Sequence, residues 1–382
     1  MSTIGIDARK IRDFGIGRYL AGLLEGLADL PGPERYVLFL PPDPERALPE
    51  DLSRRLSPER FERATVRAPL YSLRELFAFR DLPARHALAI VHFPHYVRPL
   101  VRNARVTVTV HDLIHLDWAP SLPARIYANR MLRRAARADR ILTVSEAVRT
   151  DLVRRLGVPD GRIHVAPNAV SPTFRPPAPA DVERFRRERG VSPDAVLLVA
   201  SHRPHKNLRG GIDAWRLAGA HGPLLVPARD DDTAARLRPA LEDTGATILR
   251  DVADRDLPLL FAAVRAVLVP SLAEGFGLVP LEAAACGACV VAHALPAHRE
   301  GVGDAALLAE DLTPDSLAAM LRLAQRDDAA RDRVRAAGPA RAQAFSWRRT
   351  AEITRDVWRS LLPSAAPGPG RASPGDGPAA LC

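Results

Sequence analysis

Short apolar runs alternate along the chain with longer segments in which apolar residues recur every three or four positions. The first pattern is typical of buried strands and the second of amphipathic helices, so their regular alternation predicts β-α-β units and parallel sheets. Strands are predicted at residues 4–7, 36–40, 89–93, 106–110, 140–144 and 163–166, and then at 196–200, 224–226, 247–249, 264–269 and 289–292. Helices are predicted at 17–28, 145–156, 207–218, 257–263 and 279–286.

A proline-rich stretch at residues 167–179 interrupts this alternation and predicts an interdomain linker. The 382 residues are enough for two domains of ordinary size. We therefore expect two Rossmann-like α/β domains, 1–171 and 172–345, facing each other across a cleft. The spacing of apolar residues in 346–362 predicts an amphipathic C-terminal crossover helix that packs back on the N-terminal domain. The composition of 363–382 predicts a disordered tail.

The three cysteines are too few for a disulfide framework in a chain of this size. Cys286 and Cys289 form a C-x-x-C in an alanine-rich apolar segment without a second cysteine or histidine pair nearby. This favours two small buried thiols over a redox or zinc site. Neither a signal peptide nor an apolar run of membrane-spanning length is visible, so we expect a cytoplasmic protein.

The net charge of +9 belongs to the first half of the chain. Residues 1–175 hold 28 arginines and lysines against 19 acidic residues, whereas the remainder holds 26 of each. Such an excess either covers solvated helix faces or attracts phosphate groups, for instance those of an anionic membrane. Lys10 and Lys206 are the only lysines, which suggests that these two positions require a compact point charge.

The strongest chemical signal is the segment from Glu274 to Glu282, directly after a predicted strand. Its members are Glu274, Gly275, Phe276, Gly277, Leu278 and, in the first turns of the following helix, Glu282. Glycines allow backbone N–H groups to approach a ligand, a helix N-terminus favours a diphosphate, and carboxylates accept hydrogen bonds from sugar hydroxyls. The segment therefore predicts a pocket for a phosphorylated sugar.

Two glutamates separated by seven residues in this setting resemble the retaining glycosyltransferases of family 4, which have the GT-B fold. The resemblance extends from residues 5–9 to residues 345–347. It implies that Glu282 binds the ribose of a nucleotide sugar and that Glu274 lies beside the donor sugar. It also implies that Arg203 and Lys206 grip the donor diphosphate, where fixed cations stabilise the leaving group. Ala200 departs from the glycine that is common at its place in the family.

The first half of the chain contains further candidate site residues. Gly15 and Gly17 lack the third glycine of a dinucleotide fingerprint, which argues against an NAD-dependent oxidoreductase. By resemblance they form the N-terminal glycine loop that faces the donor phosphates, with Arg18 as an acceptor or phosphate contact; a simple tight turn is the alternative.

His111 follows a predicted strand, and by resemblance it lies near the donor sugar as a catalytic candidate with Glu274. Its neighbour Asp112 is expected to orient the ring. His92 and His95, at another strand end, are candidate acceptor contacts.

No metal-ligand pattern is visible, and the resemblance implies a metal-independent enzyme that needs no cofactor. The resemblance thus implies a retaining hexosyltransferase, such as a mannosyltransferase, that uses a UDP- or GDP-sugar and a glycan or lipid-linked acceptor in envelope polysaccharide or lipopolysaccharide assembly. Contact with the cytoplasmic membrane face is expected, and nucleic acid is not. The alternative is a non-catalytic protein that binds a nucleotide sugar or polyanion.

Overall fold

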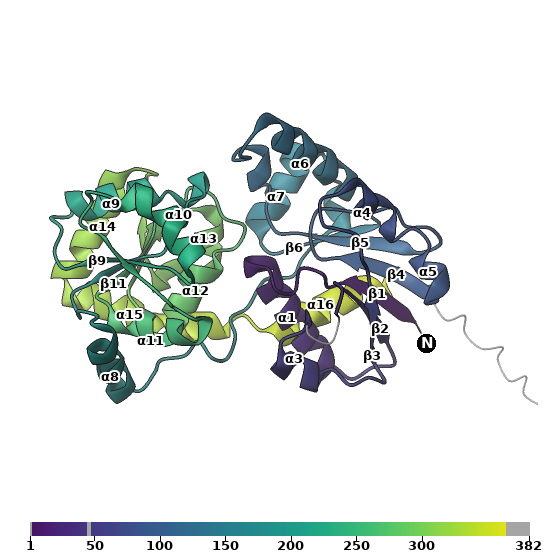
Figure 1. Cartoon of the computed structure of the whole chain (residues 1–382), viewed down its shortest axis with the longest axis horizontal. Helices are drawn as coiled ribbons and strands as arrows, with labels where there is room; N and C mark the ends of the chain where they lie inside the picture. Colours follow the sequence, from purple (N-terminus) through teal and green to yellow (C-terminus); the bar gives the residue numbers. More distant parts are fainter. Residues whose placement is uncertain (1, 44–46, 364–382) are drawn as a thin grey trace, which may run out of the picture.

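The computed structural model describes residues 2–43 and 47–363, which form two α/β domains side by side (Figure 1). The predicted disordered tail and Cys382 lie outside the described residues, apart from residue 363. The predicted fold class, two Rossmann-like domains built on parallel sheets, is confirmed.

The first domain contains a seven-stranded parallel sheet with the strand order β3-β2-β1-β4-β5-β6-β7. Its strands are β1 (Thr3–Asp7), β2 (Arg35–Leu40), β3 (Phe61–Thr65), β4 (Leu88–Phe93), β5 (Arg105–Val110), β6 (Arg140–Thr143) and β7 (Ile163–Val165). Its helices are α1 (Phe14–Asp29), α3 (Glu50–Arg55), α4 (Leu73–Ala78), α5 (Leu82–Arg85), α6 (Leu122–Ala135) and α7 (Glu146–Leu156).

The second domain contains a six-stranded parallel sheet with the order β10-β9-β8-β11-β12-β13. Its strands are β8 (Val196–Leu198), β9 (Leu224–Pro227), β10 (Thr247–Leu249), β11 (Ala266–Val269), β12 (Val290–His293) and β13 (Leu307–Ala309). Its helices are α8 (Pro179–Arg189), α9 (Leu208–Leu217), α10 (Asp231–Leu241), α11 (Leu257–Ala263), α12 (Leu278–Ala285), α13 (Pro296–Gly301), α14 (Pro314–Arg326) and α15 (Asp328–Gln343).

Helices bury both faces of each sheet, as parallel sheets require. In the first sheet, Ile90 belongs to the apolar cluster on one face and Val91 to the cluster on the other. In the second sheet, Leu197 and Leu198 are divided in the same way. Each domain therefore has its own core, and the strand ends remain free to carry functional residues.

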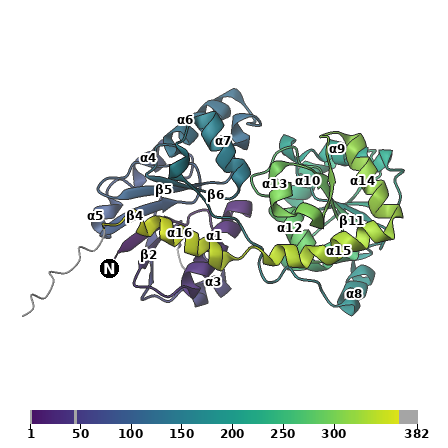
Figure 2. The same ribbon diagram turned by 180° about the vertical axis from the view of Figure 1, so that it is seen from behind.

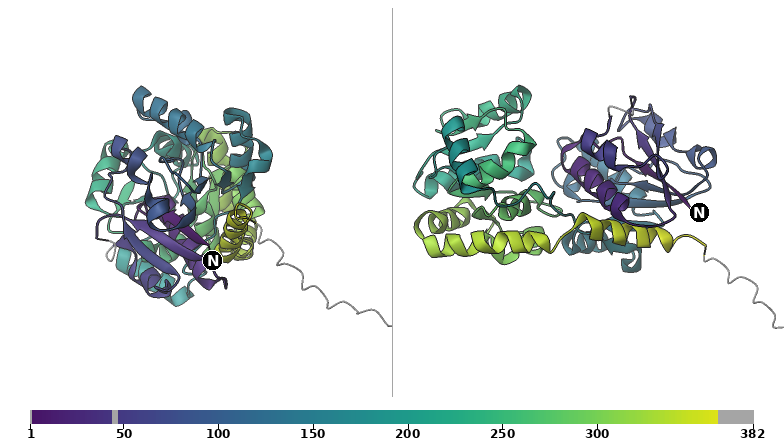
Figure 3. Two further views of the ribbon diagram at one scale, coloured as in Figure 1. Left: turned by 90° about the vertical axis from the view of Figure 1, so that its right-hand side faces the viewer. Right: turned by 90° about the horizontal axis from the view of Figure 1, so that it is seen from below.

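The last helix, α16 (Trp347–Arg359), leaves the second domain and lies along α1 of the first (Figures 2 and 3). Two glycines of α1 allow this close approach: a Cβ atom at Gly22 would lie 2.1 Å from the Trp347 ring, and one at Gly26 would lie 2.4 Å from the Trp347 carbonyl oxygen. Trp358 is fully buried and its indole N–H donates to Thr107. Helix α16 thus ties the end of the chain to the first sheet.

Candidate functional site at the contact between the domains

The strand orders place one switch point in each sheet, where strands that are distant in sequence become neighbours. These points lie between β1 and β4 in the first sheet and between β8 and β11 in the second. Open α/β sheets bind ligands at the carboxyl ends of strands beside such points. Residues 8–18 follow β1, residues 199–206 follow β8 and residues 270–277 follow β11, so most candidate residues lie at these two places.

The loop after β11 reaches the first domain at Gly275. A Cβ atom there would lie only 1.9 Å from the carbonyl oxygen of His111, so the contact requires a glycine. The hydroxyl of Ser145 donates to the Gly275 carbonyl oxygen at 2.6 Å. The same serine is the predicted N-cap of α7, where it accepts from the N–H of Val148. The glycine loop thus meets the ends of β5 and β6.

Helix α12 begins behind this loop. Its N-cap, Gly277, has a φ of +84°, a left-handed conformation that suits glycine. A Cβ atom there would lie 2.7 Å from the His298 ring, which is an independent reason for glycine. Phe276, a predicted donor contact, has its side chain in the core, where it meets Phe345 edge to face. Only the backbone of Phe276 remains available to a ligand at this loop.

Lys206 and Glu274 form a salt bridge, with Nζ 2.6 Å from a carboxylate oxygen. Lys206 ends a short 3-10 turn (Pro204–Lys206), and Asn207 then caps α9 by accepting from the N–H of Gly210. Burial opposes ionisation of Glu274, but the charge of Lys206 holds its pKa below the usual value. The structure therefore brings these two predicted residues together as a charged pair.

Glu282, in α12, is buried and pairs with Arg18 of the first domain. One guanidinium nitrogen lies 2.7 Å from both carboxylate oxygens, and the other lies 3.4 Å from Asp254. Burial and the nearby charge of Asp254 raise the pKa of Glu282 to about 7, against the influence of Arg18. Arg18, expected on the acceptor or phosphate side, thus contacts the residue predicted to bind ribose.

The remaining candidates near this contact differ in their surroundings. Arg203 is exposed and caps the turn that carries Lys206. Gly17 needs its missing side chain, because a Cβ atom would lie 2.6 Å from the Ile11 carbonyl oxygen. Gly15, in contrast, is exposed with open space around it. The first turn of α1 is therefore accessible from the side of Gly15.

His111 is held by a backbone oxygen rather than by its neighbour. Its Nε2–H donates to the Pro94 carbonyl at 2.9 Å, while the Asp112 carboxylate accepts from the N–H of Ile114. The Asp112 carboxylate thus caps the next turn and acts on the ring through its charge. Burial lowers the pKa of His111 to about 4. The ring is neutral at pH 7, with Nδ1 as its hydrogen-bond acceptor.

His92 and His95 do not offer the acceptor contacts that their strand end predicts. His92 is fully buried, and its two ring nitrogens meet the hydroxyls of Thr107 and Thr109. Residue alternation along β4 turns this side chain into the sheet core beneath α16, where its ring meets Trp358. His95 is also buried, with Nδ1 accepting from the N–H of Val97. Both histidines have structural surroundings.

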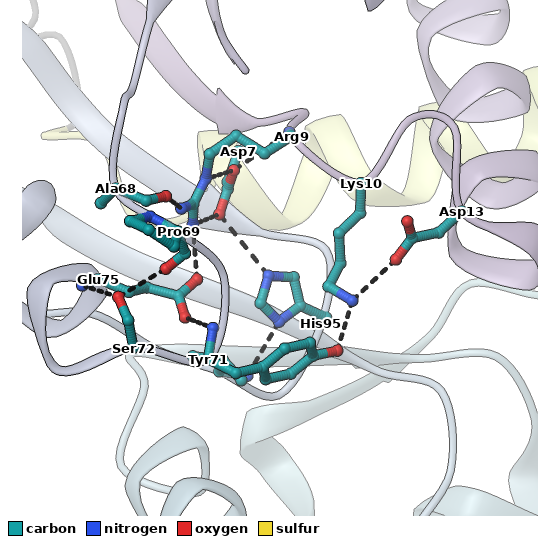
Figure 4. Close-up of polar contacts among 11 residues, drawn as sticks. Asp7, Arg9, Lys10, Asp13, Ala68, Pro69, Tyr71, Ser72, Glu75 and His95 are labelled. Atoms are coloured by element: carbon teal, nitrogen blue, oxygen red, sulfur yellow. Dashed lines mark hydrogen bonds and ion pairs between the residues drawn. The ribbon is translucent and has the colours of Figure 1, made fainter. Parts of the chain in front are cut away.

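His95 belongs to a buried ion cluster that sequence reasoning missed (Figure 4). Arg9 donates to Asp7 and, at 2.7 Å, to Glu75, and the Nε2 of His95 lies 3.6 Å from Asp7. Burial opposes ionisation of Asp7, but Arg9 and His95 hold its pKa below the usual range. The sequence signal for it is the series Asp7, Ala8 and Arg9 at the end of β1, and Glu75 lies far from these residues along the chain.

Ligand atoms of Asp7, Glu75 and His95 lie within 4.8 Å of one another, a spacing that a metal ion also requires. The guanidinium of Arg9, however, contacts both carboxylates and offsets part of their charge. A metal ion would have to displace a buried arginine that is fixed by these ion pairs. The residues therefore fit a structural ion cluster better than a metal centre.

The cluster fixes Tyr71 above Lys10. The second oxygen of Glu75 accepts from the N–H of Tyr71, which has a left-handed φ of +61°. The buried ammonium of Lys10 donates to the Tyr71 hydroxyl and to Asp13 (Figure 4). The two lysines of the chain thus lie on opposite sides of the domain contact, each in an ion pair.

The C-x-x-C lies in the apolar core of the second domain. Cys286 and Cys289 are free and buried, and burial raises the pKa of each thiol to about 12. The prediction of two small buried thiols is confirmed. No helix in the described part of the chain is long and apolar enough to cross a lipid bilayer.

Comparisons with known proteins cover both domains. Residues 15–174 match the model of Glycosyltransferase Family 4, and residues 193–327 match that of Glycosyl transferases group 1. The chain is 29% identical over 304 residues to O-antigen chain mannosyltransferase B of Escherichia coli, covering 76% of this chain and 78% of that protein. It is 32% identical over 296 residues to a D-inositol 3-phosphate glycosyltransferase of Kineococcus radiotolerans, covering 70% and 67%.

Among solved structures, Anabaena HepE in complex with UDP and glucose matches 94% of this chain and 100% of its own with a TM-score of 0.69 and 19% identity. A likeness at this level of identity shows a shared fold.

Proposed function

The chain belongs to glycosyltransferase family 4 and is a glycosyltransferase of the GT-B type; from this premise we propose that it transfers a hexose from a UDP- or GDP-sugar with retention of configuration. The observation that carries the proposal is the Lys206–Glu274 pair at the switch point of the second sheet, with Glu282 buried in the helix that follows the same loop.

The donor binds the second domain in this proposal. Glu282 accepts hydrogen bonds from the ribose hydroxyls, for which both of its oxygens are needed. The diphosphate lies at the N-terminus of α12, where the N–H groups and the helix dipole favour negative charge. Lys206 and the exposed Arg203 add positive charge to the same place. Glu274, beside Lys206, accepts from hydroxyls of the donor hexose.

Transfer depends on stabilising the nucleoside diphosphate as it leaves. Its negative charge grows in the transition state, and a preorganised ammonium such as that of Lys206 stabilises it more than the ground state. The acceptor hydroxyl attacks on the face from which the diphosphate departs, and the departing phosphate accepts the hydroxyl proton. No protein base opposite the leaving group is then needed.

The environment of His111 supports a positioning role. A ring with a pKa of about 4 is a weak general base at pH 7, because the best catalytic pKa lies near the working pH. Its Nδ1 accepts a hydrogen bond from the donor sugar, while the Pro94 carbonyl fixes the ring. This arrangement favours retention over inversion.

Metal independence is part of the proposal. Protein cations take the place of a metal ion at the diphosphate, and the Asp7 cluster keeps Arg9 as its cation. Turnover measured after dialysis against a chelator should equal that of the untreated enzyme. Loss of turnover that added Mg²⁺ or Mn²⁺ restores would contradict this.

For the acceptor, we propose a glycan or lipid-linked saccharide of envelope polysaccharide or lipopolysaccharide assembly at the cytoplasmic face of a membrane. The name of the Escherichia coli relative refers to an O-antigen chain mannosyltransferase, which favours mannose among the hexoses. The positive charge of the first half is suited to anionic lipid headgroups.

A donor panel tests the proposal. Incubation with UDP-, GDP- and dTDP-sugars should give slow hydrolysis of one donor, and the same nucleotide should raise the melting temperature. Stabilisation without hydrolysis, or without transfer to any lipid-linked saccharide, would instead indicate a non-catalytic nucleotide-sugar binding protein.

A further inference from the structure

Exposed apolar side chains gather on one side of the N-terminal domain. Within residues 2–43 and 47–363, nine large apolar side chains are exposed, and six of them belong to three neighbouring segments: Tyr71, Leu73, Phe77, Leu100, Leu122 and Ile126. The Leu100 N–H donates to the Leu76 carbonyl of α4, and the ring of Tyr71 lies 6.4 Å from that of Tyr127 in α6. Both front and back views show α4 and α6 side by side on the outer surface (Figures 1 and 2).

The exposed residues occur at helical spacing. Leu73 and Phe77, one turn apart on α4, are 80% and 59% exposed. Leu122 and Ile126, one turn apart on α6, are 60% and 46% exposed. The opposite faces of the two helices are buried in the domain. Glu75 of α4 lies in the ion cluster, and Ala128 and Leu132 of α6 are also buried. The outward apolar faces are therefore not needed for the core.

Positive charge surrounds these apolar residues. Residues 66–80 and 118–138 contain eight arginines and one acidic residue: Arg67, Arg74, Arg80, Arg125, Arg130, Arg133, Arg134, Arg137 and Glu75. Glu75 is buried, and Arg9 pairs both with it and with Asp7. Burial and the charge of Arg137 lower the pKa of Arg134. These two segments thus carry a net positive charge, with Asp81, which pairs with Arg80, and Asp117 and Asp139 directly beyond their ends.

A bilayer of anionic lipids matches both properties. Large apolar side chains gain free energy by entering the boundary between headgroups and acyl chains, and arginines beside them meet the lipid phosphates. A nucleic acid would use the arginines but offers no apolar phase for Leu73 and Phe77. A second copy of this chain would bring the same positive charges together, which is unfavourable.

We propose that this apolar-basic surface, formed by residues 71–80, 100 and 122–137, docks the protein on an anionic membrane. The inference rests on the proposed function where it concerns the acceptor. The Tyr71 hydroxyl at the edge of the surface meets Lys10, whose charge contributes to lowering the pKa of His111 at the domain contact. An acceptor anchored in the bilayer therefore reaches the domain contact from the docked side.

Vesicle binding by the full chain tests the proposal. The probe is sedimentation with vesicles of phosphatidylglycerol and phosphatidylethanolamine, compared with phosphatidylcholine vesicles. We expect binding to the anionic vesicles alone, and the double variant Leu73→Ser/Phe77→Ser should weaken it by about tenfold or more. The matched control is Leu217→Ser/Leu312→Ser, whose leucines are 49% and 50% exposed in the other domain, and it should bind like the wild type.

A second double variant tests the contribution of the arginines to membrane binding. Arg125→Gln/Arg130→Gln should weaken binding and reduce its salt dependence, whereas Arg184→Gln, an exposed arginine of α8, should not. Equal binding to neutral vesicles, or no effect of the α4 variant, would overturn the proposal. A dimer that the α4 variant dissociates, or binding to RNA that displaces the vesicles and is insensitive to the α4 variant, would overturn it as well.

A nucleotide-binding assay distinguishes a failure of the membrane surface from a failure of the proposed function. All of these substitutions lie outside the donor site, so UDP or GDP should raise the melting temperature of every variant as it does for the wild type. Vesicle binding without any nucleotide effect would refute the proposed function and leave the membrane surface standing. Nucleotide binding without vesicle binding would refute the surface alone.

Discussion

One guanidinium nitrogen of Arg18 lies 2.7 Å from both carboxylate oxygens of Glu282, although the two residues belong to different domains. The proposed donor needs the same two oxygens for its ribose. Each carboxylate oxygen accepts two hydrogen bonds, so Arg18 occupies one acceptor position on each oxygen and leaves a second for the donor. The ionisation of this buried carboxyl also depends on pH.

The raised pKa of Glu282 predicts a stability change with pH. Between pH 4.5 and about 7 its carboxyl ionises in the unfolded chain but not in the folded protein, so stability falls as pH rises through this window. The loss amounts to about 3 kcal/mol when complete. Glu282→Gln removes it, so the melting temperature of the variant relative to wild type should increase from pH 5 to pH 8. Glu50→Gln, at an 82% exposed side chain, should show no such trend. A relative melting temperature that stays constant or decreases would refute the argument.

Lys206→Ala should lower turnover by about 100- to 1000-fold, because it removes roughly 2 to 4 kcal/mol of charge stabilisation in the transition state. The measurement is initial rate at saturating donor. Arg209→Ala, which removes a nearby cation that is 69% exposed and pairs with Asp213 on the same helix, is the control and should retain near wild-type turnover. Turnover of Lys206→Ala within threefold of wild type would remove Lys206 from the diphosphate site.

Arg9→Leu should destabilise the protein by about 3 to 5 kcal/mol, because it leaves the carboxylates of Asp7 and Glu75 buried without their cation. Denaturant unfolding measures the change. Arg54→Leu removes an exposed ion pair with Glu50 and should cost less than about 1 kcal/mol. If Arg9→Leu proves as mild as Arg54→Leu, the cluster does not hold the Tyr71 segment in place.

The fold was predictable because burial on both sheet faces leaves a strong local signal. Apolar strands such as β5 and β11 are short runs of branched residues, and α7 begins at Ser145 and ends at Gly157 as its capping residues predict. Helix α6 was missed for a physical reason. Leu122 and Ile126 face outward, so its apolar residues do not form the single buried stripe by which an amphipathic helix is identified.

The candidate site residues could be predicted only where a short local sequence pattern marks them. Glu274 and Glu282 flank one loop, and Lys206 follows a neighbouring strand end, so strand order brings them together. The pair between Arg18 and Glu282 spans 264 residues and depends on how the domains meet, which no local pattern encodes. His92 illustrates the opposite error. A histidine near a strand end is accessible only if the alternation of side chains turns it away from the core.

The stereochemistry of transfer tests the role of His111, because retention and inversion assign different roles to this residue. An inverting enzyme needs a base opposite the leaving group, and a half-buried imidazole with a pKa of about 4 is poorly suited to that task at pH 7. If His111 instead positions the donor sugar through Nδ1, His111→Ala should slow transfer without changing the product, whereas His115→Ala, at an exposed histidine nearby, should leave the rate unchanged. The anomeric proton of the product, observed by NMR, decides between the outcomes: an α-linked donor such as UDP-glucose or GDP-mannose must give an α-linked product. A β-linked product would refute retention while leaving the fold and the diphosphate site intact, because neither depends on which face of the sugar the acceptor attacks.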